Sequence, residues 1–338
     1  MGIDSYKTNL QKGKSNTISD VSGVTIGHLT LNNDTIQTGV TIINPTKDNI
    51  FQNKLIAANY VINGFGKTTG LLQIDELGVL ESPIALTNTL SVGICQQALI
   101  KYMLENNADI GDSTGTVNVV VGECNDGYLN DIRKLMITEE HVFSAINNCN
   151  KEVIEGSVGA GTGMSCFGMK GGIGSASREI MIDNMTYTIG TLVLTNFGLM
   201  KDFIFDDIQL SDVTTKQEKG SCIMIIATDL PLDARQLKRV CKRMSAPLVR
   251  TGSYLGNGSG DIAIAFSTKN KIPHYIKKDI IAIEVLHENH MDVVFRASID
   301  AMQESILSSL VHSETTVGRN NHIIYGIKDV LKESKKTQ

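Results

Sequence analysis

The sequence lacks the features that mark membrane, secreted and nucleic-acid-binding proteins. Its 338 residues contain no stretch of 18 apolar residues, so we expect no membrane-spanning helix. Residues 1–14 have no apolar segment and do not resemble a signal peptide. The formal net charge is −5, from 31 basic and 36 acidic residues, and the absence of a long basic run argues against nucleic-acid binding. These absences predict a cytoplasmic protein.

The sequence also has no CxxC pair. Its six cysteines lie apart and most have apolar neighbours, which predicts buried, reduced thiols rather than disulfides. His287 and His290 form an HxxH pair, but the other histidines are scattered, so no metal is predicted. Gly66-Lys67 lacks the glycine spacing of a phosphate-binding loop, and the glycine run 159–163 does not follow a clear strand. We therefore predict no cofactor.

What the sequence does contain is typical of a layered globular protein. It has 31 glycines, only five prolines and a hydrophobic share of 41%. Short β-branched runs predict buried strands at 117–121, 191–195, 222–228 and 262–266. Helices are predicted at 92–104, at 233–244 with Asp233 as N-cap, and at 297–311. Because strands and helices alternate irregularly, an α/β or α+β sandwich is favoured over a doubly wound sheet.

One junction combines a polar loop with a buried strand. Residues 211–220 are polar and predict an exposed loop, and the apolar strand Ser221–Ala227 follows at once. Many surface loops enter strands in this way, so the junction alone predicts no chemistry.

Four groups of segments, taken in order, carry more information than any one of them. They are residues 18–28; residues 83–89 with 122–131; residues 156–174 with 196–198; and Gly220-Ser221 with residues 257–268. Together they resemble the DmpA-type family of L-aminopeptidase/D-esterases, which includes the β-aminopeptidases. The similarity spans roughly residues 18 to 330, and the ordered combination is highly specific although each motif alone is weak.

The resemblance implies a precursor that cuts itself at Gly220–Ser221 into chains 1–220 and 221–338. Glycine leaves its carbonyl sterically open, so the Ser221 hydroxyl can attack it in an N-to-O acyl shift. Cleavage then gives Ser221 a free α-amine, whose reference pKa of about 8 leaves part of it neutral near pH 7. One residue would thus supply both the nucleophile and the general base.

The resemblance also assigns roles to other residues. Ser259 and Asp261 match the serine and carboxylate beside the nucleophile, although some relatives carry glutamate where this chain has Asp261. Asn196 matches an oxyanion donor, and either Tyr128 or Asn125 takes the place of an active-site aromatic. Substrate contacts are expected from the second group of segments, namely from Asn88, Glu123, Asn125 and Asp126. Purely structural roles remain open for these residues: a turn at 258–261, a strand-end cap by Asn196, and structural hydrogen bonds by Glu123 and Asp126.

The implied fold is a four-layer αββα sandwich with mixed β-sheets, of the N-terminal-nucleophile (Ntn) hydrolase type, forming a single catalytic domain over residues 1–338. The implied protein is a homo-oligomer, a tetramer of cleaved protomers, that hydrolyses N-terminal residues from short peptides, amides or esters. Two alternatives remain open. One is an acyltransferase related to the ornithine acetyltransferases, which use threonine as nucleophile, and the other is a non-processing binding protein with the same fold.

Overall fold

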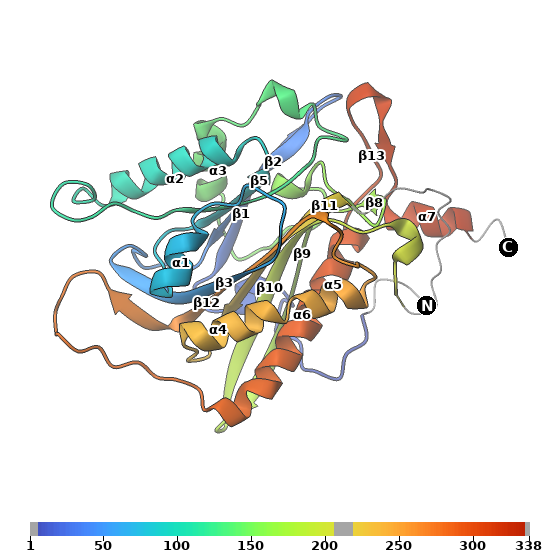
Figure 1. Ribbon diagram of the computed structural model, residues 1–338. Coiled ribbons are helices and arrows are strands. Elements are labelled where there is room, and N and C mark those ends of the chain that lie inside the picture. The colour runs from blue at the N-terminus through green and yellow to red at the C-terminus, as the bar shows by residue number, and fades with distance from the viewer. Residues whose placement is uncertain (1–5, 206–218, 335–338) are drawn as a thin grey trace.

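Two mixed β-sheets lie face to face between layers of helices in the computed structural model, which describes residues 6–205 and 219–334 (Figure 1). The first sheet has the order β1 (Thr25–Asn32), β2 (Gln37–Asn44), β5 (Ile84–Asn88), β6 (Val120–Cys124). The second has the order β4 (Val79–Leu80), β3 (Asn53–Gly64), β12 (Gly258–Pro273), β11 (Lys219–Thr228), β10 (Met185–Asn196), β9 (Ile173–Ile182). Only the β5–β6 and β11–β12 pairs within these two sheets are parallel.

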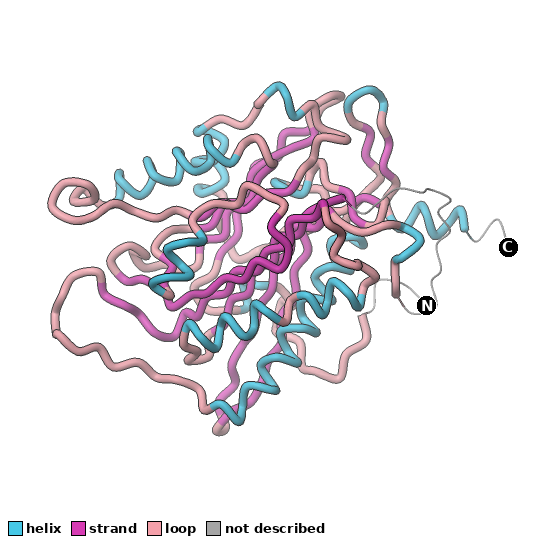
Figure 2. The backbone as a smooth tube through the Cα atoms, in the orientation of Figure 1, coloured by secondary structure: helices cyan, strands magenta, loops and turns pink. Residues whose placement is uncertain are grey.

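The helices cover the outer faces of the two sheets, as Figure 2 also shows. On the first sheet lie α2 (Val92–Asn106) and α3 (Glu139–Asn147), and on the second lie α4 (Ala234–Lys242), α5 (Ser245–Arg250) and α6 (Met291–Val311). The remaining elements are α1 (Leu71–Leu77), α7 (Ile327–Ser334), and the hairpins β7 (Ser165–Cys166) with β8 (Met169–Lys170) and β13 (Thr316–Val317) with β14 (Ile323–Ile324). This arrangement confirms the predicted αββα sandwich.

The apolar pattern of the central strands explains the two cores. Along β11, Ile223 and Ile225 belong to the core that includes the first sheet, whereas Met224 and Ile226 belong to the core beneath α4 and α6. Both faces of the second sheet are therefore apolar, which is why its central strands appear in the sequence as continuous apolar runs. The predicted strands at 191–195, 222–228 and 262–266 are confirmed within β10, β11 and β12.

The helix predictions are confirmed in outline. The Asp233 side chain accepts a hydrogen bond from the Gln236 backbone N–H at 2.6 Å and caps α4, as predicted. The prediction for α6 was too short, because the 3₁₀ turn Glu288–His290 leads directly into the helix at Met291. The strand predicted at 117–121 begins only at Val120, since side-chain hydrogen bonds of Asn118 and Glu81 hold the preceding residues in a loop.

The polar stretch predicted as a loop, 211–220, falls largely outside the described residues. Its last two positions, Lys219 and Gly220, already belong to β11. Within the described part of the chain, no helix combines the length and the apolar character needed to cross a bilayer.

Candidate active site

Three adjacent strands bring the predicted site residues to one edge of the second sheet. Because β10 runs antiparallel to β11, the last residue of β10, Asn196, pairs with Ser221 near the start of β11. The start of β12 lies on the other side of β11, since those two strands are parallel, and there Ser221 pairs with Gly260. Three separate sequence motifs therefore meet at this edge through strand register alone.

Ser221 is buried, and its hydroxyl faces the first sheet. Side chains alternate along a strand, and Ile223 and Ile225 of β11 face that sheet, so Ser221 does too. The Asn196 side-chain amide points its Nδ2 at the Ser221 Oγ, at 3.5 Å. The Asn196 Oδ1 accepts the Ser165 backbone N–H at 3.1 Å, which fixes which end of the amide faces the serine. Asn196 is thus placed as an N–H donor beside Ser221.

Ser259 and Asp261 form a buried pair on β12. The Ser259 hydroxyl donates to Asp261 Oδ1 at 2.8 Å, which shows that the two side chains share one face. Their register partners are Gly220 and Cys222, so this face is the opposite one from the Ser221 hydroxyl. After desolvation by burial, the Asp261 carboxylate raises the pKa of the Cys222 thiol and also that of the Cys124 thiol. The pair lies beside the Gly220–Ser221 backbone rather than beside the serine hydroxyl.

Gly220 occupies a position where no side chain fits. A Cβ built on it would lie 2.2 Å from the Asn196 carbonyl oxygen and 2.9 Å from the Phe197 Cα. Any other residue would force β11 away from the end of β10 and separate Ser221 from Asn196. The close approach of two backbones explains the glycine at this position.

The prediction missed a thiol beside the serine. Cys124 ends β6 in the first sheet and is fully buried, and desolvation raises the pKa of its thiol well above the usual range. A hydrogen bond with the Ser221 side chain opposes that rise. Its position immediately after Glu123 in a predicted site segment was a usable signal, but the sequence does not show that the two sheets meet here.

Glu123 and Asn88 lie on neighbouring strands of the first sheet. Glu123 is buried, accepts the Lys67 backbone N–H at 2.8 Å, and also accepts the Thr89 hydroxyl. The Asn88 side chain donates to Thr38 Oγ1 at 2.9 Å and accepts the Leu90 N–H at 3.1 Å. Glu123 directly precedes Cys124, the residue that contacts Ser221, so it is the acidic residue of this segment nearest in sequence to that contact.

The other predicted residues of that segment lie in different surroundings. Asp126 is fully buried and accepts a hydrogen bond from Asn130 at 3.0 Å, and desolvation raises its pKa to about 7. The Asn125 side chain is exposed and accepts the Gly127 N–H at 2.8 Å. Tyr128 is about half exposed and stacks on His322 with ring centroids 4.4 Å apart. Among the described residues, none of these three has a hydrogen bond to Ser221 or Asn196.

The glycine-rich loop 156–174 wraps the end of β10. Besides the Ser165 contact with Asn196, its Gly172 carbonyl accepts the Thr195 N–H at 3.0 Å. The fully buried Lys170 ammonium donates to the carbonyls of Gly161 and Gly171, at 3.1 and 2.7 Å, and so ties two parts of the loop together. Burial lowers the pKa of Lys170 to about 7, although the Asp126 carboxylate opposes that shift.

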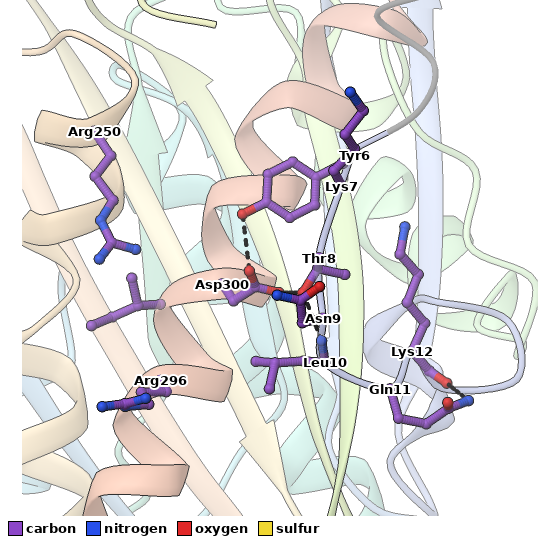
Figure 3. A pocket seen from close by; sticks show the side chains of 11 residues that line it. Tyr6, Lys7, Thr8, Asn9, Leu10, Gln11, Lys12, Arg250, Arg296 and Asp300 are labelled. Carbon is purple, nitrogen blue, oxygen red and sulfur yellow. Dashed lines mark hydrogen bonds between the residues drawn. The ribbon is translucent and has the colours of Figure 1, made fainter. Parts of the chain in front are cut away.

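A second buried polar cluster lies on the helix side of the second sheet. Arg178 on β9 is fully buried and forms ion pairs with Asp300 and Glu304 of α6. Tyr6 donates its hydroxyl to Asp300 at 3.0 Å, which ties the N-terminal segment to the same helix. Beside the cluster is a cavity of about 850 Å³, and Figure 3 shows Tyr6 and Asp300 joined on one side of it and Arg250 and Arg296 on the other. This cavity does not include any residue of the Ser221 site.

Comparison with known proteins agrees with this geometry. The model of peptidase family S58 matches residues 16–324. The β-peptidyl aminopeptidase BapA of Sphingosinicella xenopeptidilytica is 35% identical over 344 residues, which cover 93% of this chain and 85% of the relative. The crystal structure of the PH0078 protein from Pyrococcus horikoshii OT3 superposes with a TM-score of 0.92 at 45% identity, covering 99% of this chain and 98% of that one.

A further solved structure bears on the architecture. The L-aminopeptidase D-Ala-esterase/amidase of Ochrobactrum anthropi, described as a prototype of the serine aminopeptidases and a variant of the Ntn hydrolase fold, superposes with a TM-score of 0.89 at 30% identity. The alignment covers 98% of each chain. This chain belongs to peptidase family S58, and it is a serine peptidase with an Ntn hydrolase fold.

Proposed function

We propose that this protein is a self-cleaving aminopeptidase that removes N-terminal residues from short peptides, amides or esters through an acyl-enzyme on Ser221. The supporting observation is the strand register that gathers Asn196, Gly220–Ser221 and the Ser259–Asp261 pair at one sheet edge. A buried hydroxyl with an amide donor on one neighbouring strand and a buried carboxylate on the other has the parts that an Ntn nucleophile needs.

The first reaction is cleavage of the chain itself. The Ser221 Oγ attacks the Gly220 carbonyl carbon, the C–N bond breaks, and the Ser221 nitrogen leaves as an amine while Gly220 becomes esterified to the hydroxyl. Water then hydrolyses that ester, releasing a Gly220 carboxylate and the free Ser221 hydroxyl. The products are chains 1–220 and 221–338, which stay associated because β11 lies between β10 and β12 and pairs with both.

After cleavage the same edge supports peptide hydrolysis. The new Ser221 α-amine accepts the hydroxyl proton as the oxygen attacks a substrate carbonyl, and the Asn196 Nδ2 donates to the oxygen that becomes negative. Ser259 and Asp261 pair with Gly220 and Cys222, the two residues that flank Ser221 in the chain. We therefore assign the Ser259–Asp261 pair to holding this amine. This role differs from the position beside the nucleophile that the resemblance implied for the two residues.

An aminopeptidase must also recognise a free amino group on its substrate. Glu123 is the best-placed anion in the predicted segment, because it is buried and accepts the Lys67 backbone N–H next to Phe65 and Gly66, which lie against Gly260, the register partner of Ser221. We assign substrate-ammonium binding to Glu123. Contacts of substrate with Asn88, Asn125, Asp126 or Tyr128 remain predictions from the resemblance.

Intact mass of the purified protein tests the self-cleavage. We expect two species that correspond to residues 1–220 and 221–338, and a full-length species that persists on incubation contradicts the proposal. A panel of aminoacyl and β-aminoacyl anilides, in L and D forms, then defines the substrate. Acetyl transfer to an amino acid without anilide hydrolysis favours the acyltransferase alternative, and an uncut, inactive chain favours the binding protein.

We further propose that cleaved protomers associate into a homo-oligomer, and a tetramer is the state implied by the resemblance. The support in this chain is a run of exposed apolar side chains between β12 and α6.

A further inference from the structure

The segment between β12 and α6 carries a run of highly exposed apolar side chains. We call residues 275–285 the outer segment; it contains neither helix nor strand. Figures 1 and 2 show the chain here running along the outside of the molecule, away from the helical layers. Ile276 is 86% exposed and Ile280 is 85% exposed, and three more aliphatic side chains, Ile281, Ile283 and Val285, are at least 42% exposed. A contiguous apolar run of this kind marks an interaction surface.

The backbone of the outer segment is held at its ends and unpaired between them. The His274 N–H donates to the Gln52 carbonyl at 2.9 Å, just before the segment. Near its other end, the Glu284 N–H and C=O both bond to the Asn270 side chain, at 3.1 and 2.9 Å. Among the described residues, none forms a hydrogen bond with the backbone of residues 276–283. Exposed backbone of this kind is a template for pairing with another strand.

We propose that the outer segments of two copies of this chain pair as antiparallel strands across a two-fold axis, with Ile281 facing its own counterpart. This inference names a contact surface for the homo-oligomer proposed above, and it does not depend on the catalytic roles.

The Glu284 contacts fix which residues face the partner. In an antiparallel pair, successive residues direct both backbone groups alternately toward the neighbouring strand and away from it. Both groups of Glu284 are occupied by Asn270 on its own chain, so Glu284 faces away from the partner. By alternation Ile281 and Ile283, which follow bends at residues 279 and 280, then present their N–H and C=O groups to the partner strand, and residues 278–280 join the pair as these bends straighten.

The charges select one register. Two-fold symmetry requires that the pairing is centred on a single residue. With Ile281 at the centre, Lys278 stands opposite the partner's Glu284, and the symmetry repeats this pair. Centring on Ile280 or Ala282 instead places both Lys278 and Glu284 opposite apolar residues, and centring on Lys278 places that lysine opposite its own counterpart. Opposite charges on directly facing residues favour pairing, whereas like charges oppose it.

A charge exchange tests this register, with the mass of the assembled protein measured by light scattering over a dilution series. Lys278→Glu is expected to raise the dissociation constant of the contact roughly tenfold, because two attractive pairs become repulsive. Glu284→Lys has the same expected effect, although it also places a lysine next to Lys269, which now bridges Glu284 at 3.3 Å. The double variant restores association, and an equimolar mixture of the two single variants associates more tightly than either variant does alone.

Two apolar substitutions complete the test. Ile280→Glu is expected to halve the assembled mass, whereas the control Leu72→Glu leaves it unchanged, since Leu72 is 89% exposed on α1. The inference is overturned if the wild type is a single protomer in solution, or if the Ile280→Glu variant has the same assembled mass as the wild type. Aminopeptidase activity per chain is measured in the same samples, so loss of the oligomer is distinguished from failure of the proposed catalysis.

Discussion

The two buried polar clusters of the second sheet differ in the kind of groups that they bring together. Around Arg178, the guanidinium is held by two carboxylates, and Asp300 accepts further hydrogen bonds from Tyr6 and Thr8. At the Ser221 edge, the Asn196 Nδ2 lies 3.5 Å from the Ser221 Oγ, and the Asp261 carboxylate accepts the Ser259 hydroxyl at 2.8 Å. Ion pairs between distant segments tie those segments together, whereas a serine hydroxyl beside an amide donor supplies a nucleophile and a group that can stabilise an oxyanion. We therefore assign stability to the first cluster and chemistry to the second.

The largest expected effect comes from removing the serine hydroxyl. Ser221→Ala abolishes self-cleavage and lowers kcat by roughly 10⁴-fold or more, because the nucleophile of both reactions is gone. Intact mass and anilide hydrolysis measure the two losses. Ser267→Ala is the matched control. Like Ser221, Ser267 is a buried serine of the second sheet, but it lies on β12 and donates its hydroxyl to the Leu230 carbonyl, away from the Ser221 site. Aminopeptidase activity in purified Ser221→Ala contradicts the assignment.

The opposite pattern is expected for Arg178. Arg178→Met leaves Asp300 and Glu304 as buried or half-buried carboxylates without their shared cation, which costs about 3–5 kcal/mol of unfolding free energy. Urea unfolding measures this loss, while kcat of the folded fraction stays close to that of the wild type. Lys12→Met, which removes only the more exposed partner of Glu304, is expected to cost far less. A large fall in kcat with unchanged stability reverses our assignment of the two clusters.

The sequence predicted the residues of the reactive cluster better than it predicted their geometry. Ser259 and Asp261 share one face of β12, which follows from the local rule that side chains alternate along a strand. Their position opposite Gly220 and Cys222, rather than beside the Ser221 hydroxyl, depends on the register between β11 and β12, which no local pattern encodes. Cys124 was missed for the same reason, since its contact with Ser221 arises from the packing of one sheet on the other.

The fold shows the same division between local and long-range information. The cap at Asp233 and the apolar face of α4 were predictable, because both are set by residues within one helix. The start of β6 was not, because Glu81 holds Asn118 from a distant part of the chain. The ionic cluster around Arg178 joins the N-terminal segment, β9 and α6. These three segments lie more than 100 residues apart in the sequence, so no local pattern predicts their contact.

A smaller effect than that of Ser221 is expected from the oxyanion donor. Asn196→Ala lowers kcat by about 10²–10³-fold with little change in KM, because the amide acts mainly on charge that develops in the transition state. Asn196→Asp keeps the oxygen that accepts the Ser165 N–H but loses the donor, so it is expected to fall equally far. Steady-state kinetics on an anilide measure both variants. A decrease of less than tenfold in each assigns Asn196 to capping the strand end instead.

The smallest expected effect separates Asp126 from the paired carboxylates of the Arg178 cluster. Burial raises the pKa of Asp126 from its usual 3.8 to about 7, so between those values the folded protein keeps a proton that the unfolded chain releases. Wild-type stability from this group is therefore greatest below about pH 4 and declines as the pH rises toward 7. Asp126→Asn removes the dependence, so the unfolding free energy of the variant should gain on the wild type by up to about 1.4 kcal/mol per pH unit. Urea unfolding of both proteins at pH 5, 6 and 7 measures this slope, and a difference that stays constant with pH means that Asp126 remains ionised in the fold, as an ion-paired carboxylate does.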